Sequence, residues 1–196
     1  MISFRSSHLA VPLSLAALLF ASHASAQSEH VAPATEFAKS VVVKWISDPA
    51  VIAAIKAQNA KHAALSEDEI IKLDKQWRAE VDAGDKPLIS AVLGNDVSKF
   101  LTAKKEEAGG AVTEIFVMDN KGLNVGQSDV TSDYWQGDEG KWQKTFLAGP
   151  DAIFVDEVEK DESTQMLQTQ VSVSIKDPAT NEAIGAITVG LNIEML

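Results

Sequence analysis

The feature that most constrains the fold is a change of hydrophobic period at Gly109-Gly110. Before these glycines, apolar residues recur at the three- to four-residue spacing of amphipathic helices. After them, apolar and polar residues alternate as they do in strands. A run of helices followed by strands in consecutive hairpins is typical of an α+β domain with an antiparallel sheet. We therefore predict one such domain, with a helical part over 35–110 and a sheet part over 111–196.

The helical part contains several start and stop signals. Phe37, Val41 and Trp45 form one stripe of a first helix, which we expect to begin near Thr35. Asp48-Pro49 ends that helix and opens a second one, because proline disfavours a helical conformation in the residue before it and is well placed at a first helical position.

The next helices have equally clear boundaries. Ser66 and Glu69 have the spacing of a capping box, and Gly84 is expected to end that helix in a left-handed conformation. A short helix is predicted over Pro87–Leu93, and Asn95 is the expected cap of the last one.

Five strands are predicted after the glycines. Turn residues separate the first two, and we interpret Asp119 to Gly122 as a hairpin turn and not as a calcium loop, because alternating acidic ligands and a distal glutamate are missing. A short helix is expected over Asp138–Phe146. The predicted strands are 112–118, 123–127, 152–158, 165–176 and 183–193.

The first 26 residues have the pattern of a secretory signal peptide. Arg5 precedes an apolar run from Leu9 to Phe20, and Ala24-Ser25-Ala26 fits a small-residue cleavage site. An uncleaved N-terminal anchor is the alternative. We expect a signal peptide over 1–26, a flexible lead-in over 27–34 and a soluble, periplasmic product, because no later stretch is apolar enough to span a membrane.

Composition excludes several classes of function. The chain has no cysteine, which excludes thiolate chemistry and cysteine-ligated metal sites and suits a periplasmic protein without disulfides. Its formal net charge of −11 disfavours binding to nucleic acid. No phosphate-binding loop, dinucleotide fingerprint, nucleophile elbow or zinc-binding pair occurs. We expect no enzyme activity, no metal and no cofactor.

Three segments resemble the extracytoplasmic sensor domains of the Cache (PDC) family. They are the hairpin Ile115–Gln127, the run Asp133-Tyr134-Trp135-Gln136-Gly137-Asp138, and the ending Ile184–Leu191. The resemblance implies a five-stranded antiparallel PAS-like sheet behind an N-terminal helical region, with a small-molecule pocket on one face. Because no apolar span or output domain follows the last predicted strand, we expect a free-standing domain.

The pocket is expected beside the segment after the first hairpin. Asp133 or Asp138 could bind an ammonium group, while Tyr134 and Trp135 could supply cation–π contacts and Trp142 a further wall. Equally, the tryptophans could only cover the sheet and the aspartates only cap the following helix. The predicted function is a periplasmic sensor-type domain that binds a small polar metabolite, such as an amino acid, an amine or a carboxylate.

Two other functions compete with this prediction. One is a protein-interaction module for a membrane-bound receptor or kinase, whose mark would be an exposed apolar face around Val42, Val43 and Ile46. A receptor or kinase is also the candidate partner if the domain senses a ligand. The other is a hydrolase that uses Asp133 and Asp138 as a carboxylate pair.

Overall fold

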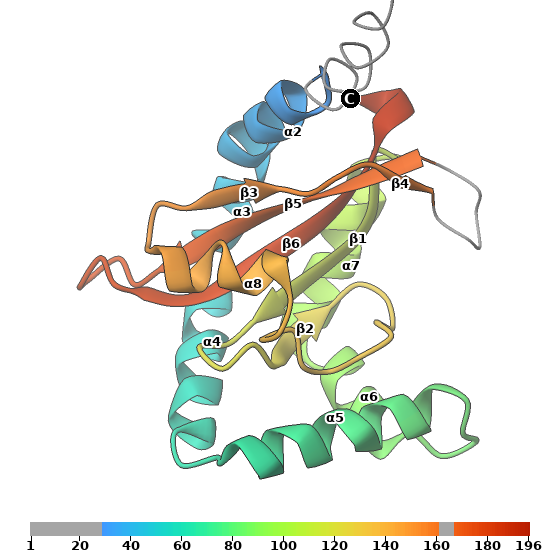
Figure 1. Cartoon of the computed structure of the whole chain (residues 1–196), viewed down its shortest axis with the longest axis vertical. Coiled ribbons are helices and arrows are strands. Elements are labelled where there is room, and N and C mark those ends of the chain that lie inside the picture. The colour runs from blue at the N-terminus through green and yellow to red at the C-terminus, as the bar shows by residue number, and fades with distance from the viewer. Residues whose placement is uncertain (1–28, 161–166) are drawn as a thin grey trace, which may run out of the picture.

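Helices occupy the first half of the chain and strands the second, as the change of period predicts (Figure 1). The computed structural model describes residues 29–160 and 167–196, so the predicted signal peptide over 1–26 lies outside the described residues. The α-helices are α2 (Val31–Phe37), α3 (Val43–Ile46), α4 (Pro49–His62), α5 (Glu67–Val81), α6 (Pro87–Leu93), α7 (Asp96–Glu107) and α8 (Gly140–Gln143). A π-helical turn, η1 (Ala38–Val42), joins α2 to α3, and 3-10 turns occur at η2 (Phe146–Ala148) and η3 (Ile193–Met195).

Most predicted helix boundaries are confirmed, but α5 ends at Val81 and Gly84 does not adopt the predicted left-handed conformation. The Asp48 carboxylate accepts a hydrogen bond from the Ala50 amide at 2.8 Å, with Pro49 in the first turn of α4. Both bonds of the capping box between Ser66 and Glu69 are present at the start of α5. The first helix begins earlier than predicted, at Val31, and thus includes four residues that the sequence assigns to the lead-in. One of them, Ala34, is fully buried, so packing against the core holds this start of the helix.

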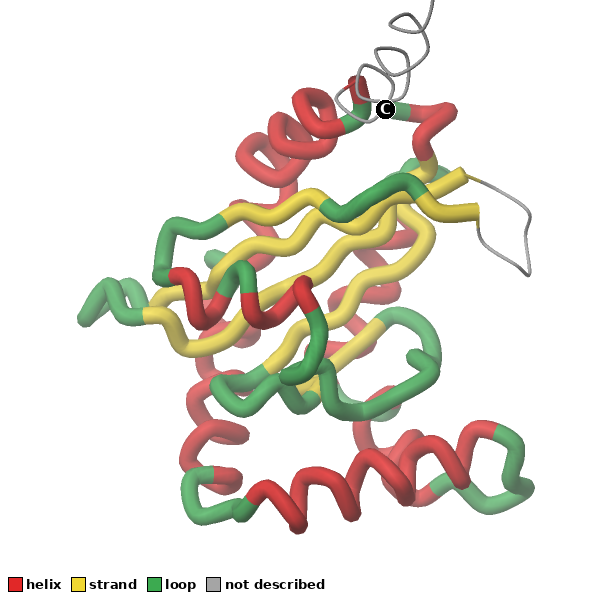
Figure 2. The backbone as a smooth tube through the Cα atoms, in the orientation of Figure 1, coloured by secondary structure: helices red, strands yellow, loops and turns green. Residues whose placement is uncertain are grey.

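The strands form one antiparallel sheet in the order β2-β1-β6-β5-β3 (Figure 2). They are β1 (Val112–Met118), β2 (Asn124–Gln127), β3 (Ile153–Val155), β4 (Glu159–Lys160), β5 (Leu167–Lys176) and β6 (Ala183–Asn192). The predicted strand over 152–158 is shortened to β3, and β4 is a separate pair with the start of β5. The predicted class, α+β with an antiparallel sheet, is confirmed.

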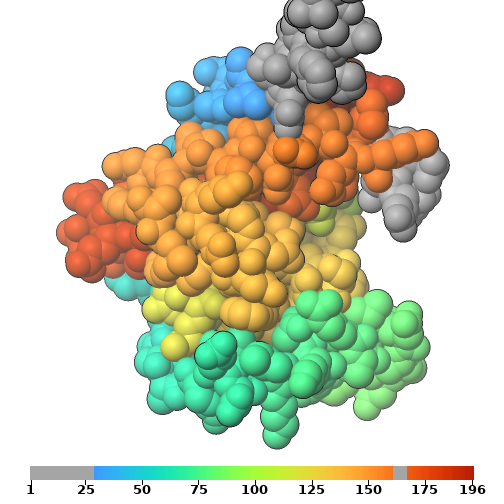
Figure 3. Space-filling model, viewed as in Figure 1, coloured from blue at the N-terminus to red at the C-terminus, as the bar shows by residue number. Residues whose placement is uncertain are grey.

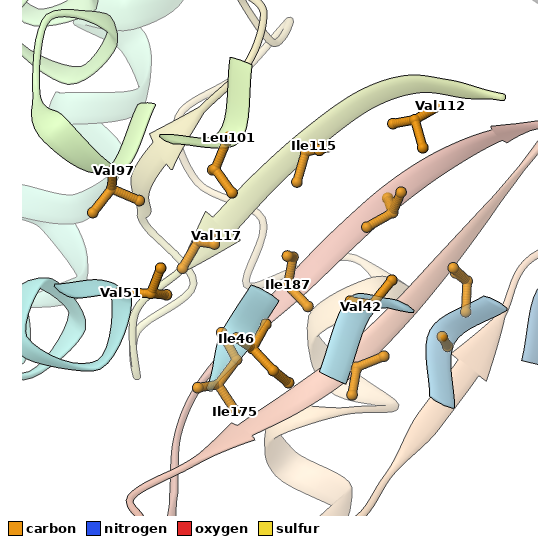
Figure 4. Packing of buried hydrophobic residues seen from close by; sticks show 14 of the residues in the cluster. Val42, Ile46, Val51, Val97, Leu101, Val112, Ile115, Val117, Ile175 and Ile187 are labelled. Carbon is orange, nitrogen blue, oxygen red and sulfur yellow. The ribbon is translucent and has the colours of Figure 1, made fainter. Parts of the chain in front are cut away.

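One face of the sheet, which we call the helix face, packs against α2 to α4 and α7 (Figure 1). Val42 and Ile46 point onto the strands, close to Ile175 and Ile187 (Figure 4). Val42 and Ile46 are 0% and 8% exposed, and only Val43 of the suggested interaction face is exposed, at 40%. The leading helix therefore uses its apolar stripe for the core of this domain and does not present it to solvent.

Helices α5 and α6 form a separate hairpin beside β2 and the loop that follows it (Figure 1). Trp77 is fully buried in the cluster that joins this hairpin to Leu123 and Tyr134. The Glu80 carboxylate accepts hydrogen bonds from the amides of Leu88 and Ile89 at 2.8 and 3.0 Å, and so caps the start of α6 from a distance. Among residues 29–160 and 167–196, no helix is both long and apolar enough to cross a bilayer.

Candidate functional site

The second face of the sheet, which we call the outer face, is covered by the segment from Gly137 to Pro150. Figure 1 shows α8 on this side, opposite the leading helices, and in Figure 3 the same segment hides the middle of the sheet. The predicted helix over Asp138–Phe146 is shorter than expected, because it consists of the four-residue α8, with η2 following from Phe146. Segments of this kind, held on the surface of a rigid sheet, often carry binding residues in proteins.

A row of side chains with mixed chemistry crosses the outer face. The strand registers place Phe116, Thr188, Ser172 and Phe154 side by side on four neighbouring strands. Ser172 and Thr188 are fully buried, and their hydroxyl oxygens lie 2.9 Å apart, within hydrogen-bonding distance. Each hydroxyl therefore satisfies the other in a layer that could have been entirely apolar.

The aromatic cover rests on this row. Trp142 stacks on Phe146, with ring centroids 5.1 Å apart, and both pack against a cluster that contains Phe116, Met118 and Ala186. The indole nitrogen of Trp142 donates a hydrogen bond to the Asp119 carbonyl at 3.1 Å, which ties α8 to the turn of the first hairpin. Aromatic rings in such a cover provide contact area and a site for cation–π interactions.

Beside this cluster lies a polar hollow of about 130 Å³, which we call the rim hollow. The Lys141 ammonium lies 2.7 Å from the Glu139 carboxylate and 5.5 Å from the centre of the Phe116 ring. The Gln170 amide donates to Glu114 at 2.7 Å. The lining residues are Glu139, Lys141, Asp156, Glu157, Glu159, Gln168, Thr169 and Gln170. The rim hollow thus combines an ammonium, several carboxylates and two amide side chains.

Tyr134, a predicted ligand residue, faces the α5–α6 hairpin. Its ring stacks on Trp77 with centroids 5.3 Å apart and an angle of 17° between the planes. Burial raises the pKa of the Tyr134 phenol, and the negative charge of Asp119 raises it further. The phenol is therefore protonated throughout the physiological pH range.

Asp133 is held by α5 as well. Its carboxylate accepts hydrogen bonds from Arg78 at 3.2 Å and from Gln136 at 2.5 Å. The Asp74 carboxylate accepts hydrogen bonds from the backbone amides of Tyr134 and Trp135 at 2.9 and 3.1 Å, which fixes the start of the loop that leads to α8. The pKa of Arg78 is raised, mainly by its hydrogen bond to Asp74. Desolvation lowers this pKa, but the negative charges of Asp133 and Asp138 raise it further.

The five predicted residues therefore lie in different surroundings. Trp142 lies on the outer face, while Asp133 and Tyr134 contact α5. Trp135 donates its indole N–H to the Lys121 carbonyl at 2.8 Å, and Asp138 is exposed. The ligand-binding role of all five stays a prediction, because the geometry shows what they contact within the protein and not what they bind.

Several residues of the outer face were not predicted as site residues. Lys141 and Gln170 line the rim hollow, and Ser172 and Thr188 form the buried hydroxyl pair. The alternation of serines and valines over 171–175 does place Ser172 opposite the apolar face, and this was the one available signal. The position of Lys141 at the rim hollow depends on the path of the chain after β2, and no local sequence pattern specifies that path.

Comparison with known proteins identifies sensor domains as the solved structures similar to this chain. No protein-family model matches the chain, and no curated protein matches it in sequence. The sensory domain of the Campylobacter jejuni chemoreceptor Tlp3 with bound isoleucine is 16% identical, with 81% of this chain and 62% of that chain covered and a TM-score of 0.38. The sensor domain of the V. cholerae histidine kinase DctB is 14% identical, with coverages of 73% and 57% and a TM-score of 0.38.

The ligand-binding domain of the Pseudomonas aeruginosa amino acid chemoreceptor PctC, in complex with GABA, is 12% identical, with coverages of 73% and 57% and a TM-score of 0.41. The chain thus spans about three fifths of the length of these structures. All three are sensory or ligand-binding domains of a chemoreceptor or a histidine kinase. At these identities and TM-scores the likeness carries no role, ligand or site residue over to this chain.

Proposed function

We propose that the chain is a non-enzymatic, sensor-type domain that binds a small polar molecule on the outer face, at the rim hollow. The observation that carries the proposal is the chemistry of that hollow, in which Lys141 lies beside Glu139 and above the Phe116 ring. Ammonium, carboxylate, amide and aromatic groups within one small hollow are the set that recognises a molecule with both charged and polar groups.

The expected ligand is a small amino acid, amine or carboxylate. Lys141 could bind a ligand carboxylate, while Glu139 and Asp156, which also line the hollow, could accept hydrogen bonds from a ligand ammonium. The hollow of about 130 Å³ is too small for a nucleotide or a peptide without movement of its cover. Trp142 is the proposed aromatic wall, since it packs against the cluster that contains Phe116, the ring next to the Lys141 ammonium.

The other four predicted residues support the site from a distance in this proposal. Asp133, Tyr134 and Trp135 hold the loop against α5 and the first hairpin, and this loop leads directly into α8. Asp138 remains exposed, where its carboxylate can attract a cationic ligand toward the segment.

The remaining parts of the proposal concern location and partners. The signal-peptide pattern of the first 26 residues supports export to the periplasm. A membrane-bound receptor or kinase is the proposed partner through which ligand binding would be reported.

A thermal-shift screen tests the proposed function. The purified protein would be heated with isoleucine, valine, alanine and GABA, which are ligands of the similar structures, and with small amines and carboxylates. A ligand that binds only the folded state raises Tm. We expect at least one compound to do so, and Lys141→Met to abolish the shift.

Lys144→Met is the matched control, because Lys144 is also a lysine beside an aromatic ring, with its ammonium 4.2 Å from the centre of Phe154, but it does not line the rim hollow. This variant should keep the full shift. A screen in which no compound raises Tm, or a shift that survives in Lys141→Met, would refute the proposed site.

A further inference from the structure

A second hollow, of about 460 Å³, lies at the opposite side of the sheet from α8 and is separate from the rim hollow. It opens where β5 extends past the beginning of β3, since the ladder between these strands starts at Ile153 and Val173. Pockets for small organic molecules have volumes of about 300–1,000 Å³. The lining residues are Val43, Ile46, Ser47, Ile52, Pro150, Asp151, Ile153, Val173, Ser174, Ile175, Lys176, Pro178 and Asn181. We call it the edge hollow.

Most of the wall of the edge hollow is aliphatic. Val43, Ile46 and Ile52 come from α3 and α4, and Ile153 and Ile175 come from the strands. Val43 is 40% exposed, although Val42 and Ile46 are buried in the core. The hollow therefore leaves part of an apolar wall in contact with water, and an aliphatic chain would remove that surface from water.

One ion pair interrupts this wall. Asp151 and Lys176 form an ion pair at 2.7 Å, with side chains that are 81% and 47% exposed. Ser174 also lines the hollow, but its side chain belongs to the outer face, because its partner on β6 is Ala186 of the cluster under α8.

We propose that the edge hollow binds an aliphatic amine, with the alkyl chain against Val43 and Ile153 and the ammonium on Asp151. The exposed ion pair is weak because water screens it, so a ligand ammonium can replace Lys176 at little cost. The formal net charge of −11 attracts a cation and repels a carboxylate. This site is independent of the proposed function, because it shares no lining residue with the rim hollow.

Calorimetric titration of the purified protein with n-octylamine tests the proposal, with n-octanoate as the head-group control. We expect saturable binding of the amine and at least tenfold weaker binding of the carboxylate. Val43→Lys should weaken amine binding at least tenfold, because it places a positive charge in the apolar wall. Val31→Lys is the matched control, since Val31 is 39% exposed on α2 and does not line the hollow.

A second pair of variants tests the head group. Asp151→Asn should weaken amine binding several-fold, whereas Asp96→Asn should leave it unchanged, although Asp96 also forms an exposed ion pair with a lysine. Lys141→Met should have no effect on octylamine, which separates this site from the rim hollow.

Three outcomes would overturn the proposal. They are the absence of amine binding, equal binding in Val43→Lys and Val31→Lys, and preference for octanoate. A concentration-dependent dimer that Val43→Lys alone dissociates, without amine binding, would assign the hollow to a second copy of the chain instead.

Discussion

The two faces of the sheet are built from the same three strands but with different chemistry. On the helix face, Val117, Ile187 and Val173 lie in one row, and all three are in the aliphatic core. The next residue along each strand faces the other way, so the outer face presents the Phe116 ring and the buried hydroxyls of Thr188 and Ser172. The difference teaches that the helix face gains its stability from aliphatic burial alone, while the outer face includes buried polar groups that must pair with each other.

The largest effect should come from the helix face. Ile187→Ala removes a fully buried side chain at the centre of this face (Figure 4). We expect a loss of about 2–5 kcal/mol in the free energy of unfolding, because the cavity cannot collapse between the packed helices and strands. Urea unfolding followed by tryptophan fluorescence measures it. A loss below about 1 kcal/mol would contradict the comparison, since the helix face would then tolerate a cavity and could not be the part of the molecule that determines its stability.

A smaller effect is expected from the cover of the outer face. Trp142→Phe keeps a ring that can stack on Phe146 but removes the hydrogen bond to the Asp119 carbonyl. We expect a loss of about 0.5–1.5 kcal/mol in unfolding free energy, the usual value for one hydrogen bond. The same urea experiment measures it. If Trp142→Phe destabilised the protein as much as Ile187→Ala, the cover would be part of the structural core and not an adjustable layer.

The helix face was predictable from the sequence and the outer face was not. Valine and isoleucine at every second position over 171–175 predict both the strand and its buried side, and Ser66 with Glu69 predicts the start of α5. These signals are local, so they do not depend on tertiary structure.

The position of the loop after β2 depends instead on contacts between distant residues. Asp74 binds the amides of Tyr134 and Trp135, which are about sixty positions away in the chain. The run Asp133 to Asp138 has the composition of a binding segment, but its first residues turn toward α5. The sequence therefore predicts a binding segment, and only the structure distinguishes Trp142 and Lys141 on the outer face from Asp133 and Tyr134 on the hairpin.

The hydroxyl pair on the outer face offers a finer test of the comparison. Thr188→Val removes one hydroxyl and leaves that of Ser172 buried without its partner, which should cost about 1–3 kcal/mol. The double variant Ser172→Ala/Thr188→Val removes both groups and should be less destabilised than the single variant, because no polar group is left unpaired. A double-mutant cycle by urea unfolding measures the coupling. Additive losses would show that the two hydroxyls do not depend on each other.

The smallest effect concerns pH, and it belongs to neither face but to the α5–α6 hairpin. Burial alone would raise the pKa of the Glu80 carboxyl, but hydrogen bonds from the Ile89 amide, the Gln76 side chain and the Leu88 amide outweigh it, so the pKa lies below its ordinary value of 4.5. A carboxyl whose folded-state pKa is lowered stabilises the fold above its unfolded-state pKa, and this stabilisation is lost as the pH falls through the folded-state value.

We therefore expect Glu80→Gln to be less stable than the parent at pH 7, and the difference between them to shrink as the pH falls below 4.5. Tm measured from pH 7 down to pH 3 for both proteins tests this. Glu106→Gln is the control, because Glu106 is a surface glutamate in α7 whose replacement should leave the pH profile of the parent unchanged. If Glu80→Gln followed the parent with a constant offset over this range, the acid-sensitive contacts would lie elsewhere, and the carboxylates around the rim hollow on the outer face would be the next to replace.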